Sequence, residues 1–363
     1  MMKRALICLC ACLLCLLPAQ TALAAGENDG DCIYTLVNAD GAVLTRRAAR
    51  MYEGDEYISA DNRHYRVAFV DDARCVATAE ELGQATIDEA AFAAFLSAHA
   101  ETDPANDDEK LICMYSTHSD ESYVPSDGAS SLWENAGIYD VGEALKQSLE
   151  AKGITVEYSQ DSFLPHDADA YNRSRSTVEE YVKQAPDAII DIHRDGVEAE
   201  EYETEVDGED TSMVRLFVGR SNQNAAENKA FAQRLKAAAD EAYPGLIKDI
   251  FIGKGNYNQE LYPQAILLEF GTYEIEKEKA ISATEYMADV IDEVLFGGSA
   301  QAATGEKNGS AAKGIAWAVG VAAVLAAIYA LAATGKLGPA WTKFKRGAQE
   351  MGAGLFGRGK DPH

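Results

Sequence analysis

The hydrophobic residues over 110–297 follow two alternating patterns. Short apolar runs, LICMY (111–115), DAIIDIH (187–193) and QAILLEFG (264–271), have the length and composition of strands buried on both faces. Between them, stretches such as VGEALKQSLEAKG (141–153) repeat apolar residues every three or four positions, which is typical of an amphipathic helix. Strands that alternate with helices predict a domain of the α/β class, with a mostly parallel open sheet and helices on both faces.

Residues 31–78 follow another pattern, in which short apolar runs flank turn residues. CIYTLVNADGAVLTRR (32–47) places Asn-Ala-Asp-Gly between two such runs, and YISADNRHYRVAFV (57–70) places Ala-Asp-Asn-Arg in the same way. Both are hairpin signals, so the sequence predicts a small β module before the larger domain. Over residues 79–109 we expect a helix followed by an acidic linker.

The two ends of the chain carry apolar segments of a different kind. Residues 1–24 have a basic start and a short apolar core, which predicts a secretory signal peptide, with a retained anchor as the alternative. Residues 314–334 are 21 residues without a charge, enough to span a bilayer, with a buried Ala-rich helix as the alternative. With a flexible stalk at 298–313 and a basic tail at 335–363, the sequence predicts a single-pass protein of the cell membrane, with an extracytoplasmic main domain and a cytoplasmic tail.

Charge and cysteine content narrow the class of protein. The net charge of −27 argues against a nucleic-acid partner, which needs a basic face. Three of the seven cysteines follow the predicted signal peptide, and an odd number outside the cytosol forbids full pairing within the chain. Cys32 and Cys75 border the small module and could form a disulfide, whereas Cys113 lies in an apolar run and is expected to be a buried thiol.

Polar side chains stand at the carboxyl ends of three predicted strands. His118 and Glu121 follow LICMYS, His193 ends DAIIDIH, and Glu269 lies near the end of QAILLEFG. Ligand sites in open α/β sheets form outside the carboxyl ends of the strands, so we expect these residues to converge. Two imidazoles and one carboxylate form a known catalytic Zn²⁺ set. The sequence therefore predicts His118, Glu121 and His193 as zinc ligands and Glu269 as the general base.

Each of these assignments has a plainer alternative. A histidine that ends a strand is more often a hydrogen-bonded neutral residue than a ligand, and Glu269 could be a buried partner of Arg194 or Lys254. Arg194 is a candidate catalytic residue that binds a substrate carboxylate or a developing oxyanion, or else it pairs with Asp195 or Asp191. Asp191 could also orient a metal ligand from behind.

Several segments resemble the stage II sporulation protein P family in order and spacing. They are THSDESYVP, HDADAYNRSRSTV, DIHRDG, VRLFVGRSNQN and YNQELYPQAILLEFGTYE, and GDEYISADNRHYRV looks like the region before the catalytic domain of that family. The resemblance covers roughly residues 31–296. It implies a fold similar to that of the zinc N-acetylmuramoyl-L-alanine amidases, with 110–297 as the catalytic domain.

The resemblance also implies roles for individual residues. By motif, His118 and His193 are the zinc ligands and Glu269 is the catalytic carboxylate. Related amidases take their third ligand from the start of the helix after the first strand, which here is Glu134 in SLWENAG. Glu121 lies inside the recognisable motif and Glu134 does not, so we assign Glu121.

An activity and partners follow from the same resemblance. Members of the family cleave peptidoglycan between muramic acid and the stem peptide, are credited with cutting the stem-peptide cross-link, and act with other sporulation proteins of the cell wall. We therefore expect a zinc amidase of peptidoglycan, held in the bilayer by its C-terminal helix, whereas the family's anchor is usually N-terminal. A zinc carboxypeptidase or endopeptidase, with the same order of His-x-x-Glu, His and Glu, is one alternative. A wall-binding protein without catalysis is another.

Overall fold

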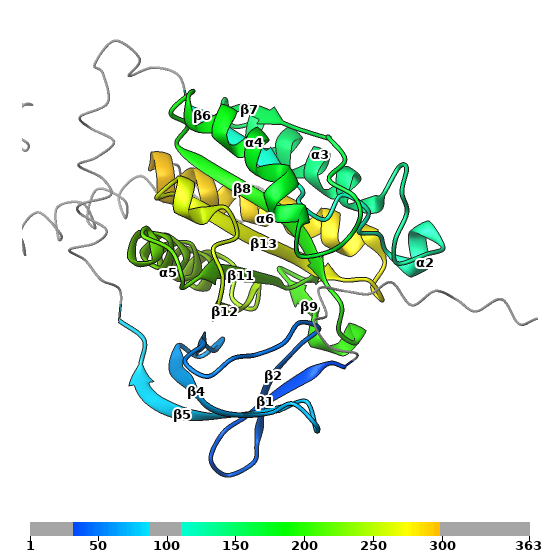
Figure 1. Cartoon of the computed structure of the whole chain (residues 1–363). Helices are drawn as coiled ribbons and strands as arrows, with labels where there is room; N and C mark the ends of the chain where they lie inside the picture. Colours follow the sequence, from blue (N-terminus) through cyan, green and yellow to red (C-terminus); the bar gives the residue numbers. More distant parts are fainter. Residues whose placement is uncertain (1–31, 87–109, 298–363) are drawn as a thin grey trace, which may run out of the picture. The chain divides into compact units, whose positions relative to one another are not determined.

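The computed structural model describes residues 32–86 and 110–297 (Figure 1). The described strands are β1 (Tyr34–Val37), β2 (Val43–Arg47), β3 (Glu56–Ile58), β4 (Arg63–Asp71), β5 (Val76–Gln84), β6 (Leu111–Tyr115), β7 (Thr155–Tyr158), β8 (Ala188–Asp195), β9 (Glu203–Val206), β10 (Glu209–Ser212), β11 (Val214–Gly219), β12 (Ile247–Gly253) and β13 (Ala265–Thr272). The described helices are α2 (Val124–Asp127), α3 (Gly137–Glu150), α4 (Ala170–Val182), α5 (Ala225–Ala242) and α6 (Lys277–Phe296), with short 3₁₀ turns η1 (Ala199–Glu201) and η2 (Gln259–Leu261).

One large sheet organises the described residues. It has 11 strands in the order β2-β1-β5-β4-β3-β12-β11-β13-β8-β6-β7, and β9 and β10 form a separate pair. β6 runs parallel to β7 and β8, β8 to β13, and β11 to β12, whereas β13 and β11 are antiparallel. Helices α3, α5 and α6 cover one face and α4 covers the other (Figure 1). The predicted α/β fold class is confirmed, and the strands after residue 110 are mostly parallel.

Alternation along the central strands separates the core from the candidate site. Ile192 on β8 and Leu268 on β13 are buried in the core beneath α3, α5 and α6. Leu267 belongs instead to the hydrophobic cluster of β1 to β5. Neighbouring side chains of a strand point to opposite faces of the sheet. His193 and Glu269 therefore project to the face opposite the core beneath α3, α5 and α6. The apolar runs that predicted buried strands therefore also fix the direction of the two polar side chains.

The first five strands contain both hairpins predicted from the sequence. β1 and β2 are antiparallel around a turn with Gly41 at φ +80°, and β3 and β4 are antiparallel around Asn62 at φ 63°. β3 also pairs with β12, so these strands continue the large sheet. Cys32 and Cys75 form the disulfide that the sequence allowed. Cys113 is a buried free thiol, and its burial raises its pKa to about 12.

The helix expected over residues 79–109 is wrong at its start. Residues up to Gln84 belong to β5, which is antiparallel to β4 and parallel to β1. Ala77 and Ala79 are buried, two positions apart, as a strand requires. Pairing with one strand on each side, β1 and β4, therefore overrides the helix propensity of this Ala- and Glu-rich segment. Residues 87–109 lie outside the described residues.

The predicted location in the cell membrane is corrected by the structure. Among the residues that the structure describes, no helix combines the length and the hydrophobicity that a membrane crossing requires. The two longest of these helices, α5 and α6, are amphipathic and carry charged residues on their exposed sides. The segments predicted as signal peptide, stalk, membrane helix and basic tail, at 1–24, 298–313, 314–334 and 335–363, lie outside the described residues.

Candidate metal centre

Three side chains predicted as metal ligands come together at the carboxyl ends of β6 and β8. The ligand atoms of His118, Glu121 and His193 all lie within 4.8 Å of one another. Glu121 Oε1 is 3.6 Å from Nδ1 of His118 and 3.6 Å from Nδ1 of His193. The centroids of the two imidazole rings are 4.9 Å apart, so two residues 75 positions apart in the chain share one site.

The spacing of these atoms suits an ion between them. A distance of 3.6 Å is longer than a normal N–H···O hydrogen bond. Four ligands bound tetrahedrally at about 2.0–2.1 Å from zinc stand roughly 3.3 Å from one another, which is close to the observed spacing. The donor set of two imidazole nitrogens and one carboxylate oxygen also matches the zinc sites of hydrolases. The residues present therefore fit a zinc ion.

Glu121 is held in place by the backbone of β8. Its Oε2 accepts a hydrogen bond of 2.9 Å from the backbone N–H of Arg194, which leaves Oε1 toward the imidazoles. Burial raises the pKa of the Glu121 carboxyl, but the positive charges of His193 and Arg194 outweigh it and hold the pKa well below its usual value. A carboxylate that stays ionised in a buried site is ready to bind a cation.

His193 is oriented from behind by Asp191. Asp191 Oδ1 lies 3.0 Å from His193 Nε2, so Nδ1 faces Glu121. Asp191 in turn accepts hydrogen bonds from the backbone N–H (2.8 Å) and the hydroxyl (2.7 Å) of Thr117. Burial lowers the pKa of His193, but the negative charges of Asp191 and Glu121 raise it by more. The pKa of His193 therefore lies well above its usual value. A carboxylate behind a ligating imidazole is the arrangement that fixes such ligands in metal sites.

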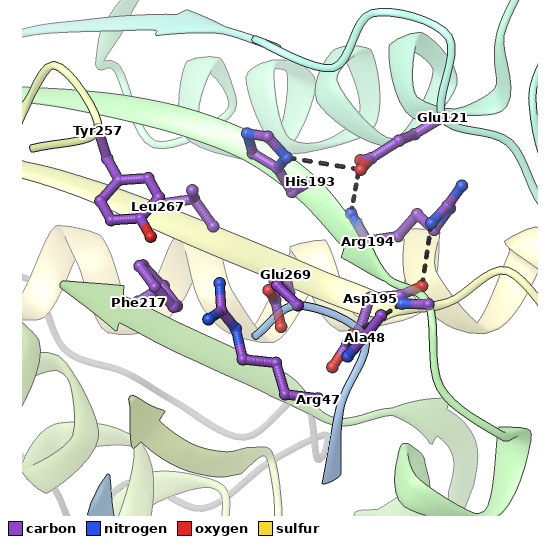
Figure 2. A pocket seen from close by; sticks show the side chains of 12 residues that line it. Arg47, Ala48, Glu121, His193, Arg194, Asp195, Phe217, Tyr257, Leu267 and Glu269 are labelled. Atoms are coloured by element: carbon purple, nitrogen blue, oxygen red, sulfur yellow. Dashed lines mark hydrogen bonds and ion pairs between the residues drawn. The ribbon is translucent and has the colours of Figure 1, made fainter. Parts of the chain in front are cut away.

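Glu269 lines the same pocket as two of the candidate ligands, Glu121 and His193. It is the cross-strand partner of His193, and both line a pocket together with Glu121 (Figure 2). Its Oε2 accepts a hydrogen bond of 2.8 Å from the Tyr202 hydroxyl, and Nη1 of Arg215 lies 3.4 Å away. Burial, followed by the charge of the nearby Asp195, raises the pKa of Glu269 to about 8. Its contacts are therefore not the ion pairs with Arg194 or Lys254 that the sequence left open.

Arg194 lines the pocket of Glu269, whereas Glu134 lies apart from the candidate ligands. The Arg194 guanidinium donates to the backbone carbonyls of Ser130 (2.8 Å) and Asp195 (3.2 Å), which ties the loop before α3 to β8. The side chain of Arg194 is buried, and its partners are carbonyls instead of the carboxylates of Asp195 and Asp191. Glu134 is exposed and lies outside the three-residue group.

Two groups of side chains beside the candidate site were not assigned a role from the sequence. His166, in the loop before α4, stacks on His118 with ring centroids 3.9 Å apart, and its Nδ1 is 2.9 Å from Asp120 Oδ1. Behind Glu269, Asp195 and Arg215 form a buried ion pair of 2.7 Å. Asp195 stands in the DIHRD motif, which was the available signal, whereas Arg215 is hidden in an apolar strand.

A family model matches most of this chain. The model for stage II sporulation protein P (SpoIIP) matches residues 48–292, which include the candidate ligands and Glu269. A curated relative, "Stage II sporulation protein P" of Bacillus subtilis (strain 168), is 30% identical over 233 residues. The alignment covers 58% of this chain and 58% of the relative, so the chain spans less than two thirds of that protein.

Solved structures of amidases match more weakly. Ami1, the N-acetylmuramyl-L-alanine amidase from Mycobacterium smegmatis, is 13% identical, with 52% of this chain and 95% of that chain covered and a TM-score of 0.33. The N-acetylmuramoyl-L-alanine amidase from Clostridium difficile 630 is 13% identical, with 53% and 97% covered and a TM-score of 0.34. Likeness at these scores supports no statement about substrate or mechanism.

Proposed function

The chain belongs to the stage II sporulation protein P family, and from this premise we propose that it is a zinc-dependent hydrolase of peptidoglycan amide bonds. The bond that we propose is the amide between muramic acid and the L-alanine of the stem peptide. The observation that carries the proposal is the convergence of His118, Glu121 and His193 within 4.8 Å, with Glu269 lining the same pocket as Glu121 and His193. Work on the cell wall during sporulation, with other wall proteins as partners, is part of the same proposal.

In this proposal His118, Glu121 and His193 hold the metal. Zinc, when bound, supplies Lewis-acid activation of a water molecule and of the amide carbonyl. Asp191 fixes the ring of His193, and the backbone N–H of Arg194 fixes Glu121. Arg194 is thus proposed as a positioning residue, because its guanidinium is engaged by two carbonyls.

Glu269 is proposed as the catalytic carboxylate. It takes a proton from the attacking water and delivers the proton to the nitrogen of the leaving L-alanine. Its position across the strand pair from His193 supports this role, and the Tyr202 hydroxyl holds one of its oxygens while the other remains for the proton. The raised pKa, about 8, suits a group that accepts and returns a proton near neutral pH.

Digestion of purified cell wall tests the proposal. The protein is incubated with peptidoglycan in zinc-containing buffer and in buffer with a chelator, and the products are identified by mass spectrometry. We expect intact stem peptides with a free L-alanine amino group and glycan strands without peptides, only when zinc is present. Free amino acids would support a carboxypeptidase instead, cleaved cross-links an endopeptidase, and no product at all a protein that only binds the wall.

A further inference from the structure

A groove of about 640 Å³ continues from the candidate metal centre. His118 and His166 are among the residues that line it, together with tyrosines. Arg47 and Tyr257 line both this groove and the pocket that contains Glu269. A substrate whose reacting bond lies beside Glu269 therefore has a continuous path along which its remainder can extend.

The charge of this groove runs against that of the chain as a whole. Four basic residues line it, Arg47, Arg50, Arg175 and Lys254, against two acidic residues, Asp167 and Glu260. The whole chain, in contrast, has a net charge of −27. Arg175 pairs with Glu260 inside the groove, and Arg50 pairs with Asp72 outside it. The groove is thus a positive region on a strongly negative protein, which favours an anionic ligand.

Arg47, at the end of β2, brings a rigid cation into the active-site pocket. Its guanidinium carbon lies 4.6 Å from the ring centre of Phe217 and 5.1 Å from that of Phe251. The side chain is only 4% exposed, and Figure 2 shows its guanidinium on the side of the pocket where Phe217 and Glu269 lie. Nη1 donates a hydrogen bond of 3.3 Å to the Arg50 carbonyl. A guanidinium packed against two aromatic rings and lining the pocket supplies a fixed positive charge that attracts a carboxylate.

Lys254, at the end of β12, stands on a loop whose backbone is hydrogen-bonded to Tyr257 and Asp55. Its ammonium lies 4.6 Å from the ring centre of Tyr52 and forms no ion pair with any residue in 32–86 or 110–297. The Tyr257 hydroxyl donates a hydrogen bond of 3.0 Å to the Lys254 carbonyl. A Cβ at Gly219 would come within 2.7 Å of the Gly255 carbonyl, so Gly219 permits the loop to lie against β11. The exposed ammonium of Lys254 therefore extends into solvent from a loop that packs against β11.

We propose that Arg47, from the small β module, and Lys254, from the end of β12, bind free carboxylates of the substrate and give the enzyme a preference for acidic stem peptides. This inference rests on the proposed function, because it places the scissile amide beside Glu269. The stem peptide carries carboxylates beyond the bond that is cut. Lying along the groove, it presents them to the buried guanidinium of Arg47 and to the exposed ammonium of Lys254.

Calorimetric binding tests this inference without any need for turnover. The full chain carrying Glu269→Gln is titrated with a muramoyl stem peptide whose carboxylates are free, and with the same peptide in which each carboxylate is a carboxamide. We expect the acid to bind about tenfold more tightly than the amide, the size expected for a hydrogen bond to a charged group. Equal affinity for the two peptides would overturn the inference.

Variants in the same background assign the preference to residues. Lys254→Met, at an exposed position that leaves the fold intact, and Arg47→Met are each expected to reduce the preference for the acid by about threefold. Arg63→Met removes a cation from β4, where Arg63 is exposed and pairs with Glu81, and is the matched control without effect. If Arg47→Met fails to fold, Lys254→Met decides alone, and an unchanged preference in that variant contradicts the inference.

Hydrolysis of the two peptides by the wild-type chain separates failure of the inference from failure of the proposed function. We expect a KM about tenfold lower for the acid. Cleavage of both peptides with equal KM leaves the function standing and overturns the inference. Cleavage of neither peptide, with zinc present, counts against the function, while the calorimetric preference still decides whether the groove selects carboxylates.

Discussion

Two clusters of buried charged side chains meet β8, one at His193 and the other at Asp195, and they differ in how their charges are balanced. Arg215 donates to both oxygens of Asp249 (2.7 and 3.1 Å), to Asp195 (2.7 Å) and to the Thr45 hydroxyl (2.7 Å). Each of these contacts is a hydrogen bond between a donor and an acceptor within the protein. The guanidinium is fully buried, and its charge is balanced by the carboxylates of Asp249 and Asp195 at 2.7 Å, with Glu269 Oε2 farther away at 3.4 Å.

The second cluster, His118, Glu121 and His193, directs its ligand atoms at one another. The carboxylate oxygen stands 3.6 Å from both imidazole nitrogens, beyond hydrogen-bond distance. The comparison teaches that burial of charge alone does not mark a site of chemistry. Arg215 closes its cluster from within and serves the structure, whereas the histidine cluster has the spacing that an external cation completes.

The largest effect is expected from His193→Ala, which removes one ligand from the histidine cluster. Hydrolysis of purified peptidoglycan should fall to the level of a blank, because two remaining ligands do not hold the metal. His64→Ala is the matched control, since His64 pairs with Glu56 on β3 and should leave activity unchanged. Circular dichroism should show both variants folded, and wild-type turnover by His193→Ala would remove the basis of the proposed chemistry.

Glu269→Gln should lower turnover by about 10²–10⁴-fold, the usual contribution of a general acid–base group. The amide cannot take up a proton, but it occupies the same space and accepts the Tyr202 hydrogen bond. Metal content should stay at the wild-type level, which separates this variant from a ligand variant. Comparable kcat values for the variant and the wild type would exclude Glu269 as the base.

Arg215→Met should affect stability first, because it opens the cluster that is closed from within. Asp249 and Asp195 would remain buried without their cation, at a cost of about 3–5 kcal/mol in the free energy of unfolding. Urea denaturation measures this loss, and Arg63→Met at an exposed ion pair is the control with no measurable change. A stable Arg215→Met protein would mean that the two clusters do not differ as described.

Asp191→Asn should have a smaller effect, through the orientation of His193. We expect metal affinity to fall by about 10–100-fold, as is usual when the partner behind a ligating histidine is changed. Competition with a fluorescent zinc chelator gives the dissociation constant. Asp187→Asn, at the residue that accepts a hydrogen bond from the backbone of Leu111, tests an aspartate near the opposite end of β8 and should leave metal affinity unchanged.

The last effect concerns the pH dependence of stability in the metal-free protein. Since the pKa of Glu269 is raised to about 8 from the usual 4.5, the folded chain keeps a proton there that the unfolded chain has already released. The contribution of Glu269 to the free energy of unfolding therefore falls as the pH rises from about 5 to about 8. Glu269→Gln lacks this dependence, so its stability relative to the wild type should increase over that interval. A constant difference would show that Glu269 is not perturbed.

The sequence revealed the metal-ligand candidates more readily than their surroundings. His118, Glu121 and His193 could be found because the carboxyl ends of neighbouring parallel strands meet at one edge, whatever the details of packing. The same pattern placed Glu269 beside them. These predictions depend only on strand assignment, which the long apolar runs made clear.

The remaining features depend on contacts between distant segments. Residues 79–84, the second part of β5, were predicted as a helix because only pairing with other strands makes them a strand. β12 was not singled out although it pairs with both β11 and β3. Thr45 meets Asp249 across 204 positions of sequence, and nothing in either local pattern indicates the other. The contribution of Arg47 to the active-site pocket was missed for the same reason.

The most direct test of the central claim is the zinc content of the purified wild-type chain, compared with His118→Ala and His193→Ala. X-ray absorption on the same samples identifies the ligands. We predict one zinc per chain in the wild type, bound by two imidazole nitrogens and a carboxylate oxygen at about 2.0–2.2 Å, and none in either variant. A wild-type chain that binds no stoichiometric zinc, or variants that bind it equally well, would contradict the account.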